Sequence, residues 1–190
     1  MDDIVKQALA KWPNVPDCYG WLGLDARGNW YMRDDRTQAA GAFPRLGNAS
    51  KESKGSLLQH EKLIDFIQRN YASDAKGQWF FQNGPQRVYV ELEATPWIWR
   101  VGRDAPNAGF DVLSHAGAKA QVLQCLVDEL GRVYLQTDMG IGLVHTQDVS
   151  CAADAIEAGV WVPEDAIAAT LGERFGFEAS PQSLQSKGRP

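Results

Sequence analysis

The chain has 190 residues, of which 44% are hydrophobic and 23% charged, and its formal net charge is −5. This length and composition are typical of one globular domain or of two small domains that share a core. An acidic chain lacks the positive field that dominates affinity for nucleic-acid phosphates and for anionic lipid headgroups. We therefore expect neither a nucleic acid nor a membrane surface as the main partner.

The N-terminal stretch MDDIVKQALAKWP opens with two acidic residues and holds no continuous apolar segment, so it lacks the pattern of a signal peptide. No run of apolar residues approaches the roughly 18 that a membrane-spanning helix needs. The three cysteines form no CxxC pair and the three histidines are isolated, so we expect no metal site and no cofactor. These features predict a cytoplasmic protein with reduced thiols.

The first predicted elements are a helix and a hairpin. Residues 2–12 place apolar side chains at helical spacing, and Pro13 ends that helix. The stretch GWLGLDARGNWYM then predicts two short strands around a turn in which Gly28 supplies a positive φ. Residues 33–55 are polar and locally basic, and a loop of this length is either mobile or an active-site lid.

A second helix is predicted to begin at Ser56, where Ser56-Leu57-Leu58-Gln59 fits a capping box. After a turn at residues 74–77, we expect strands over 78–82 and 88–92 and a third strand that begins at Pro96. On the second strand the side chains alternate, with Val88, Val90 and Leu92 on one face and Tyr89, Glu91 and Glu93 on the other.

The second half of the chain repeats this plan more loosely. The stretch AQVLQCLVDELGRVYLQT predicts a strand, a turn and a strand, and MGIGLVHT predicts one strand more. Ser150 is expected to cap a short helix, and Pro163 to begin a helix that runs to about Phe175.

One short sequence motif occurs twice. Arg87-Val88-Tyr89-Val90 is followed 45 residues later by the similar Arg132-Val133-Tyr134-Leu135. We interpret the echo as a duplication. The predicted fold is α+β, with two similar units that are each a curled, half-barrel-like antiparallel meander with a packed helix, plus short terminal helices. The predicted boundaries are 1–104 and 105–178, followed by a disordered tail at 179–190.

The order GNWYM, LIDFI, DAKGQWFF and GPQRVYVELEATPW resembles an uncharacterised bacterial family, the domain of unknown function 1285, over roughly residues 18–160. The matching positions are Gly28 with Trp30, Leu63 with Phe66, Asp74 with Gly77, Pro85, Glu91, Glu93 and Pro96. The chain departs from the family in the turn at residues 83–86 and in an apparent insertion at 36–55. The resemblance implies a duplicated α+β unit, and it leaves the activity open, with a suggestion of signalling or ligand sensing.

Glu91 and Glu93 are the best paired carboxylates, since side chains two apart on a strand share a face. Glycoside cleavage uses two carboxyl groups about 5–9.5 Å apart, although they must flank the substrate rather than stand side by side. The alternative is a solvated strand face. No catalytic residue is assigned.

Two tryptophans, Trp97 and Trp99, share a strand face and either form a stacking platform for a ring-bearing ligand or fill the core. Arg87 is placed to clamp a carboxylate or phosphate, or else lies in an exposed turn. The predicted binding surface therefore comprises Arg87, Tyr89, Glu91, Glu93, Trp97 and Trp99.

We predict from these residues a non-catalytic module that binds a small ligand or a protein partner, with a regulatory or signalling role. A hydrolase that uses Glu91 or Glu93 is the first alternative. A structural homodimer paired through exposed strand edges is the second.

Overall fold

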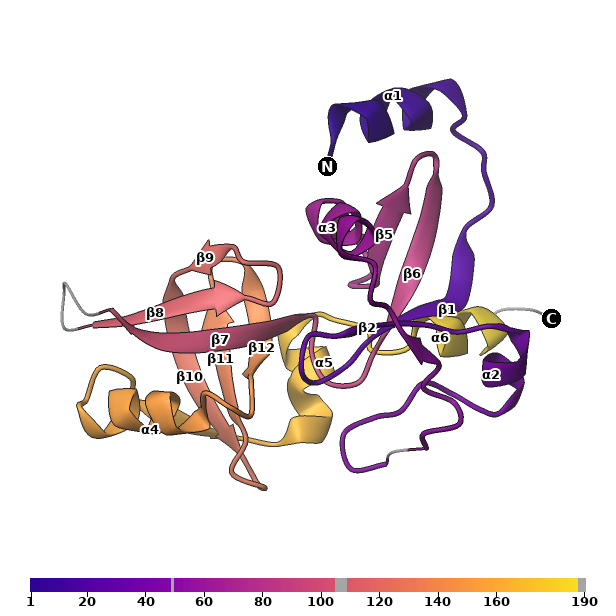
Figure 1. Ribbon diagram of the computed structural model, residues 1–190. Helices are drawn as coiled ribbons and strands as arrows, with labels where there is room; N and C mark the ends of the chain where they lie inside the picture. Colours follow the sequence, from indigo (N-terminus) through magenta and orange to yellow (C-terminus); the bar gives the residue numbers. More distant parts are fainter. Residues whose placement is uncertain (49, 105–108, 188–190) are drawn as a thin grey trace. The chain divides into compact units, whose positions relative to one another are not determined.

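A computed structural model of the protein describes residues 1–48, 50–104 and 109–187 (Figure 1). The chain forms two compact units, which we describe separately. The first unit contains Met1–Asp25, Asn29–Ala94 and the chain from Phe177 on, and the second contains Ala26–Gly28 and Thr95–Gly176. Strand β7 (Trp97–Asp104) therefore belongs to the second unit, and not to a domain that ends at residue 104.

The first unit is a six-stranded sheet in the order β3-β2-β1-β6-β5-β4. Its strands are β1 (Cys18–Leu24), β2 (Trp30–Met32), β3 (Ser56–Leu57), β4 (Tyr71–Ser73), β5 (Trp79–Asn83) and β6 (Gln86–Leu92). Neighbouring strands run antiparallel except at the centre, where β1 and β6 are parallel with Leu22 beside Val90. The sheet thus joins two antiparallel meanders through one parallel pair.

Both faces of β6 are covered by helices. The alternation of apolar and polar side chains along this strand therefore did not mark a face exposed to solvent. Helix α3 (Glu61–Arg69) packs on the face of Val88, where Phe66 meets Phe81 edge to face. Helix α6 (Pro181–Lys187) packs on β1 and β6, on the opposite face. Tyr89 and Glu91 are consequently 3% and 1% exposed, so the prediction that Glu91 lies on a solvated face is wrong.

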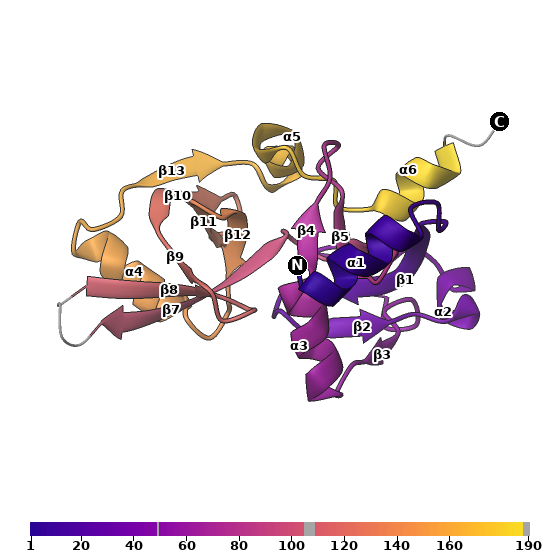
Figure 2. The same cartoon turned by 90° about the horizontal axis from the view of Figure 1, so that it is seen from above.

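Two further helices complete the first unit. Helix α1 (Asp3–Lys11) lies beside α3 (Figure 2), and the backbone N–H of Asp2 donates to Asn70 at 2.8 Å. Helix α2 (Asp35–Ala39) falls inside the stretch that we expected to be a continuous loop.

The second unit is a seven-stranded sheet in the order β13-β10-β11-β12-β7-β8-β9. Its further elements are β8 (Gly109–Ser114), β9 (Lys119–Ala120), β10 (Val122–Asp128), β11 (Val133–Thr137), β12 (Gly140–Val144), α4 (Val149–Glu157), β13 (Pro163–Ala166), the 3-10 helix η1 (Ala168–Thr170) and α5 (Leu171–Phe175). Strands β7 and β12 are parallel, as are β10 and β13, and the other neighbours are antiparallel.

The α+β class is confirmed, with two mixed sheets and few helices. Apart from β13, the two sheets share a strand order, because each joins two three-stranded meanders through the parallel pairing of its first and last strands. The helices differ, since α3 links β3 to β4 whereas β9 leads almost directly into β10. The duplication itself stays a prediction.

The echo in the sequence joins strands that occupy different places in this order. Arg87–Val90 lies in β6, whereas Arg132–Leu135 leads into β11, whose counterpart is β5. Two turns that occupy corresponding places in the two sheets do share a sequence pattern. They are D-A-K-G-Q at 74–78, between β4 and β5, and D-E-L-G-R at 128–132, between β10 and β11. In each turn the aspartate accepts backbone N–H groups two and four residues later, and Gly77 or Gly131 takes a positive φ.

Four other predictions are wrong. The N-cap of α4 is Asp148, and Ser150 lies within that helix. Ser56 begins strand β3, which pairs with β2, and the N-cap of α3 is His60, whose Nδ1 accepts the N–H of Leu63. Pro163 begins a strand beside β10 rather than a helix. The tail is not disordered through Lys187, because α6 docks on the first sheet. No helix in the described part of the chain is long and apolar enough to cross a membrane.

The burial of Trp99 leads to a first prediction. Its side chain is 0% exposed and its Nε1–H donates to the carbonyl of Leu135 at 2.9 Å. Trp99→Ala should therefore lower the free energy of unfolding by about 3–5 kcal/mol, as expected for a buried aromatic truncation. Trp12→Ala, at a site 52% exposed, is the matched control and should change it by less than about 1 kcal/mol. Chemical denaturation measures both, and equal effects would contradict this assignment of Trp99 to the core.

Candidate functional site

The predicted binding residues are divided between the two units. Trp97 and Trp99 lie in the second unit, with ring centroids 6.0 Å apart, and both indole N–H groups donate to backbone carbonyls. Trp97 is 8% exposed and Trp99 is 0% exposed. They therefore fill the core of the second unit, which is the alternative to a stacking platform.

Arg87 and Tyr89 lie in the first unit and are held by neighbours. The hydroxyl of Tyr89 donates to Asp74 at 3.0 Å, and its ring stacks on Tyr19 with centroids 4.5 Å apart. Burial raises the pKa of Tyr89 well above its usual range. The guanidinium of Arg87 lies 4.8 Å above the ring of Phe80. These contacts give each side chain a structural role, and a ligand contact at Arg87 stays a prediction.

Glu91 and Glu93 contact different groups. Glu91 accepts the hydroxyl of Ser180 at 2.5 Å and the backbone N–H of Gln182 at 2.9 Å. Burial raises the pKa of Glu91, which these two hydrogen bonds and the charge of Arg33 offset only in part. Glu93 instead forms an ion pair with Lys54 at 3.0 Å. The two carboxylates are thus engaged separately, one with the C-terminal segment and one with the polar stretch.

Arg33 is a buried cation of the first unit, and no sequence pattern pointed to it. Its side chain is 1% exposed. Nε donates to the carbonyl of Ser53 at 2.9 Å, and Nη2 donates to the carbonyl of Gly41 at 2.6 Å. Nη1 donates to the carbonyl of Gly20 at 3.1 Å and to Oε1 of Gln182 at 3.2 Å. A guanidinium so placed fixes the backbone at both ends of residues 41–53.

Three successive residues anchor the end of the polar stretch. Ser53 is bound to Arg33, and Lys54 lies between Asp25, at 3.2 Å, and Glu93. Gly55 has φ +94°, and a Cβ there would collide with the carbonyl of Met32. Buried contacts therefore hold this segment in place, while Lys51 and Glu52 just before it are exposed.

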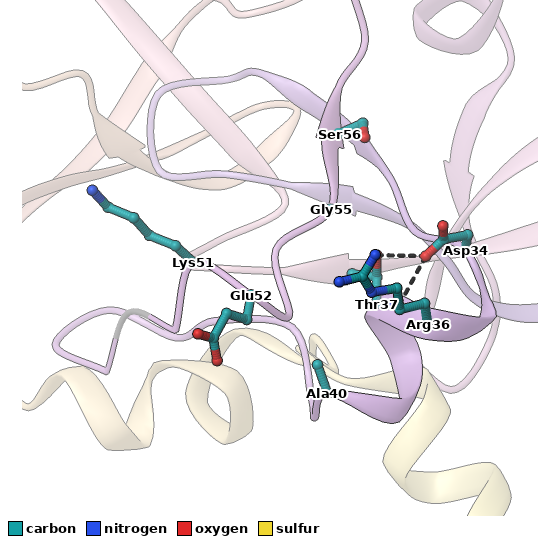
Figure 3. A pocket seen from close by; sticks show the side chains of 8 residues that line it. All are labelled: Asp34, Arg36, Thr37, Ala40, Lys51, Glu52, Gly55 and Ser56. Atoms are coloured by element: carbon teal, nitrogen blue, oxygen red, sulfur yellow. Dashed lines mark hydrogen bonds between the residues drawn. The ribbon is translucent and has the colours of Figure 1, made fainter.

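A pocket of about 500 Å³ lies between α2 and this anchored segment (Figure 3). It is lined by Asp34, Arg36, Thr37, Ala40, Lys51, Glu52, Gly55 and Ser56. The volume is within the range of small-molecule sites, about 300–1,000 Å³, although most such sites have apolar linings. The pocket is thus the candidate functional site, and its polar lining favours a polar ligand.

Of the four charged side chains that line the pocket, only Asp34 is held by hydrogen bonds within its own helix cap. Asp34 caps α2 by accepting the N–H of Thr37 at 2.8 Å and its hydroxyl at 2.6 Å, which lowers the pKa of Asp34. Within residues 1–48, 50–104 and 109–187, the side chains of Arg36, Lys51 and Glu52 form no ion pair. The pocket is thus lined by two cations and one carboxylate that have no ion-pair partner among these residues.

Asp34 at the N-cap, followed by the helix formers Gln38 and Ala39, was a readable signal for α2. No three His, Cys, Asp or Glu side chains in the described residues gather in a way that could hold a metal ion.

The family model DUF2944, described as "Protein of unknown function (DUF2946)", matches residues 1–182, and the chain belongs to this family. No curated protein matches the chain. Two solved structures are similar to it, and both are described as DUF1285 family proteins, the family that the sequence resembles.

The first of these structures, from Shewanella baltica OS155, has 16% identity and a TM-score of 0.45, and the match covers 70% of this chain and 91% of that one. The second, from Silicibacter pomeroyi DSS-3, has 10% identity and a TM-score of 0.47, covering 81% and 84%.

The raised pKa of Glu91 leads to a prediction about pH. A carboxyl group whose pKa is higher in the folded than in the unfolded state stabilises the fold fully below the unfolded pKa, about 4.3. That contribution is lost as the pH rises through the folded pKa. Glu91→Gln should therefore gain stability relative to wild type as the pH increases from about 4 toward neutrality.

Urea denaturation at several pH values measures the difference between these two proteins. Glu91→Ala is the control for packing, because it loses the hydrogen bonds from Ser180 and from the N–H of Gln182 and should be less stable than Glu91→Gln at every pH. A difference between Glu91→Gln and wild type that does not change with pH would contradict the burial effect.

Proposed function

We propose that this protein is a non-catalytic binding module and that its first unit takes a small polar ligand in the pocket between α2 and residues 51–56. The proposal replaces the predicted surface around Trp99, because that side chain is buried. It retains the predicted class of function, with the regulatory or signalling role and the cytoplasmic location as parts of the same proposal.

The observation that supports it most directly is the burial of Arg33 next to Gly55, which lines the pocket. Removing a guanidinium from water is costly unless its donors are satisfied, and here each of its three nitrogens has an acceptor. The backbone of the polar stretch is thereby held at Gly41 and Ser53, although Lys51 and Glu52 between them are exposed. A binding site benefits from this arrangement, because a rigid backbone lowers the entropy lost when a ligand binds.

The lining residues indicate the class of ligand. Arg36 and Lys51 suit a carboxylate or phosphate, and Glu52 suits an ammonium group. The hydroxyls of Thr37 and Ser56 can donate or accept. We therefore infer a small charged or zwitterionic molecule, such as an amino acid or a phosphorylated metabolite.

We also propose that the two units arose by duplication. The shared strand order and the matching turns at 74–78 and 128–132 support this origin. In this proposal the pocket is specific to the first unit, because its lining comes from the insertion between β2 and β3.

A thermal-shift panel of amino acids, nucleotides, sugar phosphates and sugars tests the binding function. A ligand at about 100 times its Kd should stabilise the protein by about 2.7 kcal/mol. The double substitution Arg36→Ala with Lys51→Ala should abolish the shift, because it removes both cations of the pocket. Lys62→Ala with Lys76→Ala removes two exposed cations elsewhere in the first unit and should preserve it.

Two results would contradict the proposal. One is a panel in which no compound shifts the melting temperature, which would favour a protein partner. The other is a shift that persists unchanged in the Arg36 and Lys51 double variant, which would move the binding site away from this pocket.

A further inference from the structure

The C-terminal segment docks on the first unit through both backbone and side chain. The N–H of Glu178 donates to Gly77 at 2.9 Å, and the N–H of Leu92 donates to Ala179 at 2.9 Å. Ser180 and Gln182 then donate to the buried carboxylate of Glu91. Helix α6 has only seven residues, too few to be stable in isolation, so its helical structure depends on this docking.

The side chain of Gln182 connects α6 to the elements that build the pocket. Its Oε1 accepts from Arg33 at 3.2 Å, and its Nε2 donates to Gln38 of α2 at 3.0 Å. It packs closely against Gly20, where a Cβ would collide with both this amide and the side chain of Gln38. The amide of Gln182 therefore fills a space bounded by β1, α2 and the guanidinium of Arg33.

The same guanidinium holds the polar stretch, since its other nitrogens bind the carbonyls of Gly41 and Ser53. Helix α2 supplies Thr37 and Ala40 to the pocket, and residues 51–56 supply the opposite side. Both sides of the pocket are thus joined to Gln182, one through Gln38 and one through Arg33. Loss of Gln182 from this position leaves a donor of Arg33 without its acceptor inside the protein.

We propose that α6 is a latch for the pocket: its docking through Gln182 and the observed conformation of residues 34–48 and 50–56 stabilise each other. This inference rests on the proposed binding function for its biological meaning. If a ligand requires residues 34–56 in this conformation, its binding strengthens the docking of α6, and docked α6 raises its affinity by the same factor. The module then reports an occupied pocket through the state of its C-terminal segment.

Amide hydrogen exchange of the full chain, without any ligand, tests the coupling. Gln182→Ala removes the two side-chain hydrogen bonds and retains the backbone N–H that donates to Glu91. We expect exchange of the amides in residues 34–56 to become roughly fivefold to tenfold faster, the factor for losing one or two hydrogen bonds. Gln185→Ala, at an exposed position on the same helix, is the matched control and should leave these amides unchanged.

The reverse direction uses Arg33→Lys, which keeps the charge and loses the planar set of donors. Exchange of the α6 amides should then accelerate along with that of residues 34–56. If Arg33→Lys does not fold, the Gln182→Ala comparison decides alone. Faster exchange in α6 with unchanged exchange in 34–56 in the Gln182→Ala protein would overturn the latch, as would unchanged exchange in both segments.

These results are separable from the proposed function, because the exchange experiment contains no ligand. An absent coupling would leave the thermal-shift result untouched. A panel without a hit would equally leave the coupling between α6 and residues 34–56 to stand as a property of the fold.

Discussion

The first unit depends on one buried guanidinium. Arg33 is nearly inaccessible to solvent, and it binds carbonyls of β1 and of the polar stretch together with the amide of Gln182. A buried charge that loses an acceptor destabilises a protein far more than an exposed one, because the remaining group is desolvated without compensation. Three segments that are distant in the chain are therefore constrained to keep their positions around this single side chain.

A second buried charge, Glu91, works with Arg33 on the same face of the sheet. Glu91 accepts hydrogen bonds from Ser180 and from the N–H of Gln182, at the start of α6. Arg33 donates a hydrogen bond to the side chain of Gln182, the second residue of that helix. The opposite charges are also near enough for each to favour the ionised state of the other. Together they explain why a short polar segment at the end of the chain is helical and docked, and why β6 has no solvent-facing side.

The sequence resolved local structure where the responsible interactions are local. The D-x-x-G turn at 74–78 was predictable because the aspartate bonds to backbone groups two and four residues later and the glycine supplies a positive φ. Strand alternation in β6 and the apolar stripe of α3 were likewise visible as periodicity. Ser56 was misassigned because its pairing with β2, and not its capping potential, decides its conformation.

The sequence by itself therefore determined the α+β class, the hairpin turns and most strand positions, since these follow from preferences within a few residues. Only the tertiary structure decided that β1 and β6 pair in parallel, that Trp97 and Trp99 are core, and that Arg33 and Glu91 are buried. The partners of these charges stand 149 and 89–91 residues away in the chain. No local pattern encodes such contacts, because they form only when the sheet brings the C-terminal segment onto its face.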